Sequence, residues 1–433
     1  MTEQGAARQL RVGIIGYGDA GRGIHARLLR AAGHLVTHVV VRNPERAAAA
    51  RSDWPGVVVL PDVGALVERA GDLDLVVVAS PTGHHVDNAI AVIAGGLPLV
   101  VDKPLAPDSA GASALVRAAA EVGVPLTVFQ NRRWDSEQLT LSALLADGTL
   151  GTVHRFERRW ERWRPVPKNR WKENDPIAGG LLLDLGAHLV DSAVQLFGPV
   201  TSVYAELRAI TTPTPDDVFL ALHHANGVVS HLSAGGLTGA PGPRTRVLGS
   251  AGAYLVTSFE GEPTPFAELD EAAAGGVDGH EGWLVHGADR VPVPRVNGGH
   301  VDFYAAVGRW ILDGGPVPVD PEDAVRTAQV LEAAVVSARE ERVVRLDWGR
   351  GAYRGRGGAP WAGGWAEGRR LGCGFGCGLW ATVGARRPTV GGAHGTRPRP
   401  VRPGRCAACG RVPRGRSGGG RVARARLGRR RAS

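Results

Sequence analysis

Residues 11–21, with the sequence RVGIIGYGDAG, run from a short apolar segment directly into three closely spaced glycines. Gly16, Gly18 and Gly21 stand in the order G-x-G-x-x-G, and a helical pattern follows them. In this arrangement the first glycine makes a tight turn, the second lets the backbone approach a pyrophosphate, and the third lets the helix pack on the strand. The stretch therefore predicts a strand–turn–helix unit that binds a dinucleotide at the helix N-terminus.

The first third of the chain repeats this alternation of strand and helix. Ala-rich helical patterns separate five apolar runs, which are residues 11–16, 35–41, 73–80, 97–104 and 125–130. Continuous Val/Ile/Leu strands joined by helices are typical of a parallel sheet that is covered on both faces. We therefore expect an α/β fold whose residues 1–128 form a Rossmann dinucleotide-binding domain.

The pattern changes after residue 128. Longer segments that read as antiparallel strands lie at residues 151–163, 201–210, 218–234 and 244–256, and Asn226-Gly227 is a hairpin signal inside the third of them. A helical pattern at residues 321–340 and a last strand at 343–348 close the region. We expect a C-terminal α+β domain over residues 129–348 with one large, mostly antiparallel open sheet. Because an open sheet leaves one face for a partner, this domain predicts a homodimer or homotetramer.

Charge divides the chain at residue 349. Residues 349–433 hold 20 Arg, no Lys and one Glu, whereas the first 348 residues keep 31 basic and 41 acidic side chains. The acidic body gives no reason to expect a specific nucleic-acid partner. The Arg/Gly-rich tail cannot bury a core, so we interpret residues 349–433 either as disordered or as an out-of-frame translation of a GC-rich gene.

All four cysteines lie in the tail, and the body has none. Cys373, Cys377, Cys406 and Cys409 suggest a zinc site, but the first spacing is loose and no apolar core surrounds them, so we expect no metal. No signal peptide precedes the first strand, and no apolar run reaches the roughly 18 residues of a membrane span. The sequence predicts a cytoplasmic protein without a membrane partner.

The end of the second strand bears on which dinucleotide binds. An NAD site usually has Asp or Glu there for the ribose hydroxyls, whereas this chain has Arg42 and Asn43, with Arg46 one turn further on. An arginine attracts a 2′-phosphate, which favours NADP. NAD stays the alternative, in which Arg42 is only a solvated residue at a strand end.

Two further strand ends carry polar groups. Ser80, Pro81 and Thr82 lie at the end of the run at 73–80, where ligands of parallel sheets bind, and we expect them along the nicotinamide ribose. His85 either faces the ligand or starts a helix. Lys103 lies near the end of the run at 97–104 and is either a solvated loop residue or an ammonium that can stabilise a developing alkoxide.

The segment GGLLLDLGAHLVDSA, which begins at Gly179, interrupts an apolar helix with Asp184, His188 and Asp191. On a regular helix these side chains form one narrow polar stripe. The stripe is either solvent-exposed or a general base, His188, beside carboxylates that set its tautomer and pKa.

Together these pieces resemble the Gfo/Idh/MocA oxidoreductase family. The resemblance rests on GYGDAG, on DKP at Asp102–Pro104 and on AGGLLLDLGAH at Ala178–His188, and it covers about residues 10–348. Asp102 stands where the family usually has Glu, and Ala178 where it has glycine. The stretches VFQNRRWDSE and RFERRWERWRP resemble those of a subgroup that includes an NADP-dependent inositol dehydrogenase.

The resemblance implies roles for single residues. Lys103 matches the family's catalytic lysine, Asp184 and His188 its substrate-side pair, and His85 a histidine on the nicotinamide side. We expect His188 to take the proton of a polyol or sugar hydroxyl while Lys103 steadies the oxygen, with Asp191 in a structural role. Further substrate-side candidates are Asn131, Arg132, Arg159, Trp160 and Trp163, although aromatic and Arg side chains on strands are more often packing or interface residues.

The sequence thus predicts an enzyme that transfers hydride between NADP(H) and an inositol, polyol or sugar. Two alternatives stay open: a regulator that binds NADP without catalysis, and a relative that uses the cofactor transiently for elimination or hydrolysis. Because a regulator has no need of Lys103, Asp184 and His188 together, their presence favours the enzyme.

Overall fold

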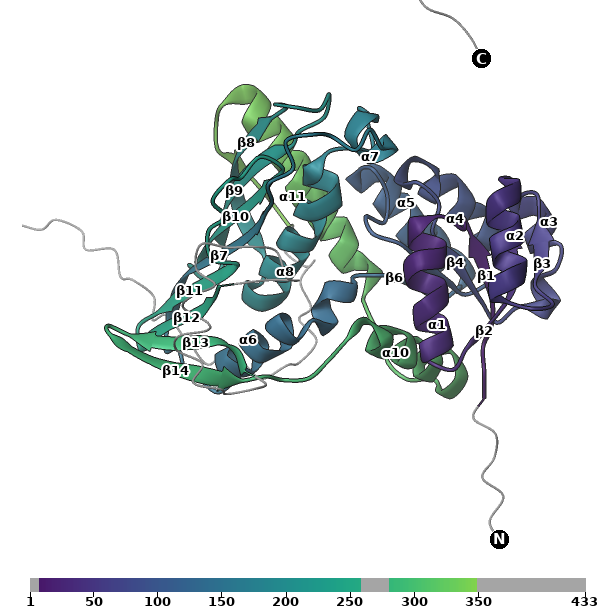
Figure 1. Cartoon of the computed structure of the whole chain (residues 1–433), viewed down its shortest axis with the longest axis horizontal. Coiled ribbons are helices and arrows are strands. Elements are labelled where there is room, and N and C mark those ends of the chain that lie inside the picture. Colours follow the sequence, from purple (N-terminus) through teal and green to yellow (C-terminus); the bar gives the residue numbers. More distant parts are fainter. Residues whose placement is uncertain (1–7, 258–279, 349–433) are drawn as a thin grey trace, which may run out of the picture. The chain divides into compact units, whose positions relative to one another are not determined.

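The computed structural model describes residues 8–257 and 280–348. Its N-terminal part is a parallel sheet of six strands in the order β3-β2-β1-β4-β5-β6 (Figure 1). This is the order of a Rossmann fold, in which the topology reverses beside β1. The strands are β1 (Arg11–Ile15), β2 (Leu35–Val40), β3 (Val58–Leu60), β4 (Leu75–Val78), β5 (Leu99–Val101) and β6 (Leu126–Val128).

The connections between these strands are helical. They are η1 (Gly21–Ala26), α1 (Arg27–Ala31), α2 (Pro44–Asp53), α3 (Val63–Val67), η2 (Ala70–Asp72), η3 (Thr82–His84), α4 (His85–Ala94) and α5 (Ser109–Val122). The predicted runs contain every strand except β3, for which no strand was predicted. This edge strand has only three residues, two of them only partly buried, so it carries little hydrophobic signal.

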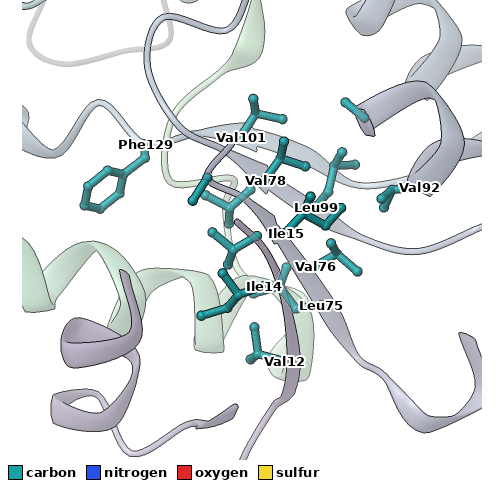
Figure 2. Packing of buried hydrophobic residues seen from close by; sticks show 14 of the residues in the cluster. Val12, Ile14, Ile15, Leu75, Val76, Val78, Val92, Leu99, Val101 and Phe129 are labelled. Carbon is teal, nitrogen blue, oxygen red and sulfur yellow. The ribbon is translucent and has the colours of Figure 1, made fainter. Parts of the chain in front are cut away.

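Buried aliphatic side chains of the central strands form the first core. Val12 and Ile14 of β1 and Val76 and Val78 of β4 are fully buried, and Figure 2 shows them packed with their neighbours. Phe303 belongs to the same core, although it lies on α10 (His300–Asp313), far along the chain. Rings of Phe129 and Phe303 meet edge to face at 5.0 Å, so a late helix completes the Rossmann core.

The second sheet has nine strands in the order β14-β13-β12-β11-β7-β10-β9-β8-β15. All of its pairs are antiparallel except the parallel pair of β7 and β10. The strands are β7 (Val153–Glu161), β8 (Val200–Arg208), β9 (Asp217–His224), β10 (Val229–Gly235), β11 (Thr245–Gly249), β12 (Gly252–Val256), β13 (His280–His286), β14 (Asp289–Pro294) and β15 (Val344–Arg345). The predicted combination of a Rossmann domain with a mostly antiparallel sheet is confirmed.

Helices cover one face of this sheet: α6 (Ser136–Ala146), α8 (Ala187–Phe197) and α11 (Pro321–Glu340) lie on the same side (Figure 1). Their apolar side chains, such as Leu189 and Leu331, build a second core with Leu220 and Leu232 of the sheet. The short helices η4 (Asn131–Trp134) and α7 (Trp171–Asn174) precede α6 and α8 along the chain. The predicted hairpin at Asn226-Gly227 joins β9 to β10, and Gly227 has a φ of 90° there.

The helix that carries Asp184, His188 and Asp191 is not regular throughout, as the predicted polar stripe required. The first turn is a π-helix, η5 (Leu182–Gly186), and α-helical geometry starts at Ala187. Because a π turn closes over five residues rather than four, it changes where Asp184 points relative to the following turn. Such turns are frequent at functional sites.

Two features that would indicate other functions are absent from the described residues. None of their helices is both long and apolar enough to span a membrane. They contain no cluster of three or more His, Cys, Asp or Glu side chains that could hold a metal ion. The tail and its four cysteines lie outside the described residues.

Candidate active site

The glycine turn after β1 has no room for side chains at its first and third positions. Gly16 has a φ of 91°, and a Cβ there would lie 2.8 Å from the carbonyl oxygen of Ala79. A Cβ at Gly21 would lie 1.9 Å from the carbonyl oxygen of Gly16. Gly18 differs, because a Cβ there would meet nothing closer than the Arg46 guanidinium at 3.5 Å. The two outer glycines thus shape the turn, while the middle one leaves its backbone open to a phosphate group.

Basic side chains stand beside this turn. Arg42 and Arg46 are exposed, and neither forms an ion pair with another described residue. Asn43 begins α2, and its side-chain oxygen accepts a hydrogen bond from the Arg46 amide at 2.9 Å. The end of β2 therefore carries Arg42 and Asn43 where an NAD site has Asp or Glu, and the first turn of α2 adds Arg46 beside Glu45.

The loop after β4 is held by His85. Its Nδ1 lies 2.9 Å from the carbonyl oxygen of Pro104, and its Nε2 lies 2.9 Å from that of Ser80. Burial lowers the pKa of the imidazole. Both ring nitrogens lie against backbone carbonyl oxygens. The His85 side chain is therefore better placed to connect the loops after β4 and β5 than to contact the cofactor directly. Ser80 also accepts from Asn88 at 2.9 Å, while Pro81 is exposed.

Lys103, which follows β5, reaches across to the π turn that precedes α8. Its ammonium donates to the backbone oxygen of Asp184 at 2.7 Å and to the Asp184 carboxylate at 3.1 Å. Lys172 of α7 donates to the same carboxylate oxygen at 2.6 Å. Burial raises the pKa of Asp184, but the two ammonium groups outweigh it and hold that pKa well below its usual range. The carboxylate is therefore ionised and shared between two cations.

His188 lies one turn further along, on the first turn of α8. It is 8% exposed, and its ring centroid is 5.8 Å from that of Trp160 on β7. Its Nδ1 is buried and has no hydrogen-bond partner among the described residues. Burial, followed by the positive charges of Lys103 and Arg132, lowers its pKa well below 6.5. The imidazole is thus neutral near pH 7, as a proton acceptor must be.

Asp191 has a different environment from the other two members of the stripe. Arg133 donates to both of its carboxylate oxygens, at 2.9 and 2.6 Å, and also pairs with Asp323 at 3.1 Å. This buried bidentate pair ties η4 to α8 and α11. Asp191 accordingly makes the contacts of a structural residue.

The remaining substrate-side candidates differ in how close they lie to His188. Arg132 lies 4.9 Å above the Trp160 ring, close to His188, and Asn131 is buried with its amide 3.1 Å from the His300 ring. Arg159 alternates with Trp160 along β7 and so points to the opposite face of the sheet, where it pairs with Glu157 at 2.8 Å. Trp163 is 61% exposed beyond the end of β7.

Sequence reasoning missed two groups near the site. Lys172 belongs to a four-residue helix with no recognisable motif, so only the contact with Asp184 reveals it. His25 of η1 lies with its Nδ1 2.6 Å from the Tyr304 hydroxyl and its Nε2 3.7 Å from Asp102. Burial raises the pKa of Asp102, but His25 and Lys103 together bring it down to about 2. The motif residue beside Lys103 is thus an ionised carboxylate.

Comparison with known proteins agrees with this architecture. Residues 10–130 match the family described as "Oxidoreductase family, NAD-binding Rossmann fold", and residues 139–255 match the "GFO/IDH/MocA C-terminal domain". The chain is 29% identical to scyllo-inositol 2-dehydrogenase (NADP(+)) IolW of Bacillus subtilis over 78% of this chain and 96% of that protein. It is 32% identical to the uncharacterized oxidoreductase YdgJ of Escherichia coli over 78% of this chain and 99% of that protein.

A solved structure shows the same fold. The YvaA protein of Bacillus subtilis superposes with a TM-score of 0.68 and 28% identity, over 79% of this chain and 99% of that one. The likeness therefore covers about four fifths of this chain and nearly all of the solved one.

Proposed function

Since the chain belongs to the Gfo/Idh/MocA family of oxidoreductases, we propose that it is an NADP-dependent dehydrogenase or reductase acting on a CH–OH group. Its substrate is an inositol, another polyol or a sugar, or the corresponding ketone. The observation that carries this proposal is the contact between Lys103, at the carboxyl end of a Rossmann strand, and Asp184, one turn before His188. Ligands of parallel sheets bind at that edge.

The residues of the cofactor site fit NADP, a dinucleotide with an additional 2′-phosphate. Gly16 and Gly21 shape the turn that brings the open backbone at Gly18 and the start of η1 toward a pyrophosphate. Arg42 and Arg46 supply positive charge for a 2′-phosphate, and Arg42 and Asn43 stand where an NAD site has Asp or Glu. When bound, the nicotinamide accepts or donates the hydride. The name of the Bacillus subtilis relative, which includes NADP(+), supports the same choice.

The chain's own residues handle the proton. In the oxidation direction the neutral His188 imidazole accepts the proton of the substrate hydroxyl. Lys103 donates a hydrogen bond to the same oxygen and stabilises the negative charge that develops on it. Asp184 accepts a hydrogen bond from a neighbouring hydroxyl, which orients a polyol. In the reduction direction the same groups return a proton to the ketone oxygen. No metal is needed in this scheme, because the ammonium carries out the charge stabilisation.

The second sheet has a face that no helix of the described residues covers, and this face could bind a second copy of the chain. The face of β9 and β10 away from the helices carries partly exposed side chains such as Phe219 and His231, whose rings lie 5.7 Å apart. We propose a cytoplasmic homodimer or homotetramer that assembles through this face. Light scattering on the purified chain, with Phe219→Glu as the disrupting variant, tests the assembly.

The test of the activity is turnover of NADP⁺ with a polyol panel and of NADPH with the matching ketones. We expect Lys103→Ala to lower kcat by about 10²–10³-fold, the usual effect of removing an oxyanion-stabilising donor. Lys168→Ala, which removes an exposed lysine, is the matched control. Tight NADPH binding without turnover of any compound would instead indicate a regulator. Substrate consumption without net NADP⁺ reduction would indicate transient use of the cofactor.

A further inference from the structure

Lys172 sits on a strap that is tied to the start of the catalytic helix. The strap is residues 162–180, between β7 and η5, and α7 is its only helix among the described residues. The Gly180 amide donates to the Lys172 carbonyl oxygen at 2.7 Å, and the Gly179 amide donates to that of Asp175 at 2.9 Å. A Cβ at Gly179 would lie 2.8 Å from the Lys172 carbonyl oxygen. The double glycine thus holds α7 against the turn that carries Asp184.

Lys103 and Lys172 make different contacts with one carboxylate. Lys172 is the closer, at 2.6 Å against 3.1 Å, and its side chain is 37% exposed, whereas that of Lys103 is 12% exposed. Lys103 uses two of its three N–H donors on Asp184, so an ammonium that turns toward a substrate oxygen shares its charge with that oxygen and holds the carboxylate less tightly. A largely buried carboxylate that loses its sole counter-ion is strongly disfavoured.

We propose that Lys172 is a positioning residue that remains the counter-ion of Asp184 when Lys103 turns to the substrate oxygen. This inference rests on the proposed function and adds a residue to it. Lys172 does not touch the reacting atoms in this scheme. It holds the carboxylate in place and makes the movement of Lys103 less costly, because Asp184 keeps a counter-ion throughout.

The charges that face this site all bear on its pH dependence. Asp184 faces Lys103 from the loop after β5 and Lys172 from α7, and His188 faces both lysines together with Arg132 of η4. Lys172 lowers the pKa of both Asp184 and His188. Removing the charge of Lys172 should therefore raise both pKa values. His188, which must be unprotonated to accept the hydroxyl proton, would then begin to protonate at a higher pH.

The kinetic test compares Lys172→Met, Lys172→Arg and the strap control Lys168→Met in the full-length protein with NADP⁺. We expect Lys172→Met to lower kcat/KM for alcohol oxidation by about 10- to 100-fold, the usual range for losing a hydrogen bond to a charged group. The acidic limb of its pH profile should move to higher pH. Lys172→Arg keeps the charge and should recover most of the rate, while Lys168→Met should match the wild type. NADPH affinity should be unchanged in all three variants.

Two kinetic outcomes would overturn the proposal. One is a Lys172→Met enzyme whose rate and acidic limb equal those of the wild type. The other is a loss of rate with an unmoved limb and no recovery in Lys172→Arg, which is what a purely structural lysine would give. Thermal melts of each variant separate either outcome from misfolding.

A second measurement needs no turnover and separates this proposal from the proposed function. Infrared titration of protein labelled with ¹³C-aspartate, with Asp184→Asn to assign the signal, reports the ionisation of the Asp184 carboxyl directly. The Lys172→Met protein should show this group protonating at higher pH than in the wild type. If no substrate is turned over but this shift is seen, the proposed function fails and the role of Lys172 toward Asp184 stands. If substrates are turned over and the shift is absent, the inference about Lys172 fails alone.

Discussion

Replacing Arg46 by Gln should weaken NADPH binding and leave NADH binding unchanged. The Arg46 guanidinium stands 3.5 Å from the position a Cβ would take on Gly18, which places it beside the phosphate-binding turn. It is exposed and has no ion-pair partner among the described residues, so its charge is available to a 2′-phosphate.

The size of the effect follows from Coulomb's law. A unit charge about 4 Å from a phosphate oxygen is worth about 1 kcal/mol in bulk water and about 4 kcal/mol near a protein surface of lower effective dielectric. Because Arg46 is exposed, the lower part of that range applies, and we expect about 1–2 kcal/mol, or about five- to thirty-fold in Kd. The effect should shrink with added salt, since exposed charges are screened over about 10 Å at 0.1 M.

Fluorescence titration with NADPH and NADH measures both constants. Arg51→Gln, another exposed arginine on α2, is the matched control and should leave both Kd values as they are. Equal weakening of NADPH and NADH by Arg46→Gln would refute the reasoning, because the 2′-phosphate is the difference between the two cofactors. A wild-type protein that prefers NADH would refute it as well.

Two further predictions concern the site and its scaffold. Because burial and neighbouring cations lower the pKa of His188 well below 6.5, its imidazole stays neutral as the pH falls through 7 and 6.5. The pH profile of kcat/KM for alcohol oxidation should therefore show its acidic limb below pH 6.5, and a limb centred at 6.5 or above would contradict this account. Gly21→Ala should lower the free energy of unfolding by about 2 kcal/mol or more, because its Cβ would lie 1.9 Å from the Gly16 carbonyl oxygen. Urea denaturation measures this loss, and Gly23→Ala, where a Cβ meets nothing within 4 Å, should show no comparable loss.

Local signals were enough to predict much of the fold. The apolar runs of the first third contain five of the six Rossmann strands, and the Asn226-Gly227 turn lies between two paired strands. Both signals act over a few residues, through side-chain periodicity and backbone dihedral preferences. The short edge strand β3 and the π turn at Leu182–Gly186 were missed, because packing against the rest of the protein decides whether such brief segments form.

Buried ion pairs gave no such local signal. Glu137 on α6 lies 3.4 Å from Arg158 on β7 and 3.2 Å from Arg244, and Arg133 is bound to Asp191. In the sequence these residues look like ordinary charged positions on a helix or strand. Only the packing of separate elements removes them from water and makes each dependent on its partner.

By itself the sequence determined the glycine turn, the parallel Rossmann domain and the two segments that carry Lys103 and His188. Each of these is encoded in a short stretch, where the backbone needs glycine or where side chains repeat with a fixed period. The tertiary structure decided which charges share a site. Lys103 and Asp184 are 81 residues apart along the chain, and Lys172 and Asp184 are 12 apart, yet one carboxylate oxygen lies within 3.1 Å of both ammonium groups. Whether two charges interact depends on their distance and burial and not on their order in the sequence. The contact between Lys172 and Asp184 could therefore be found only in the folded structure.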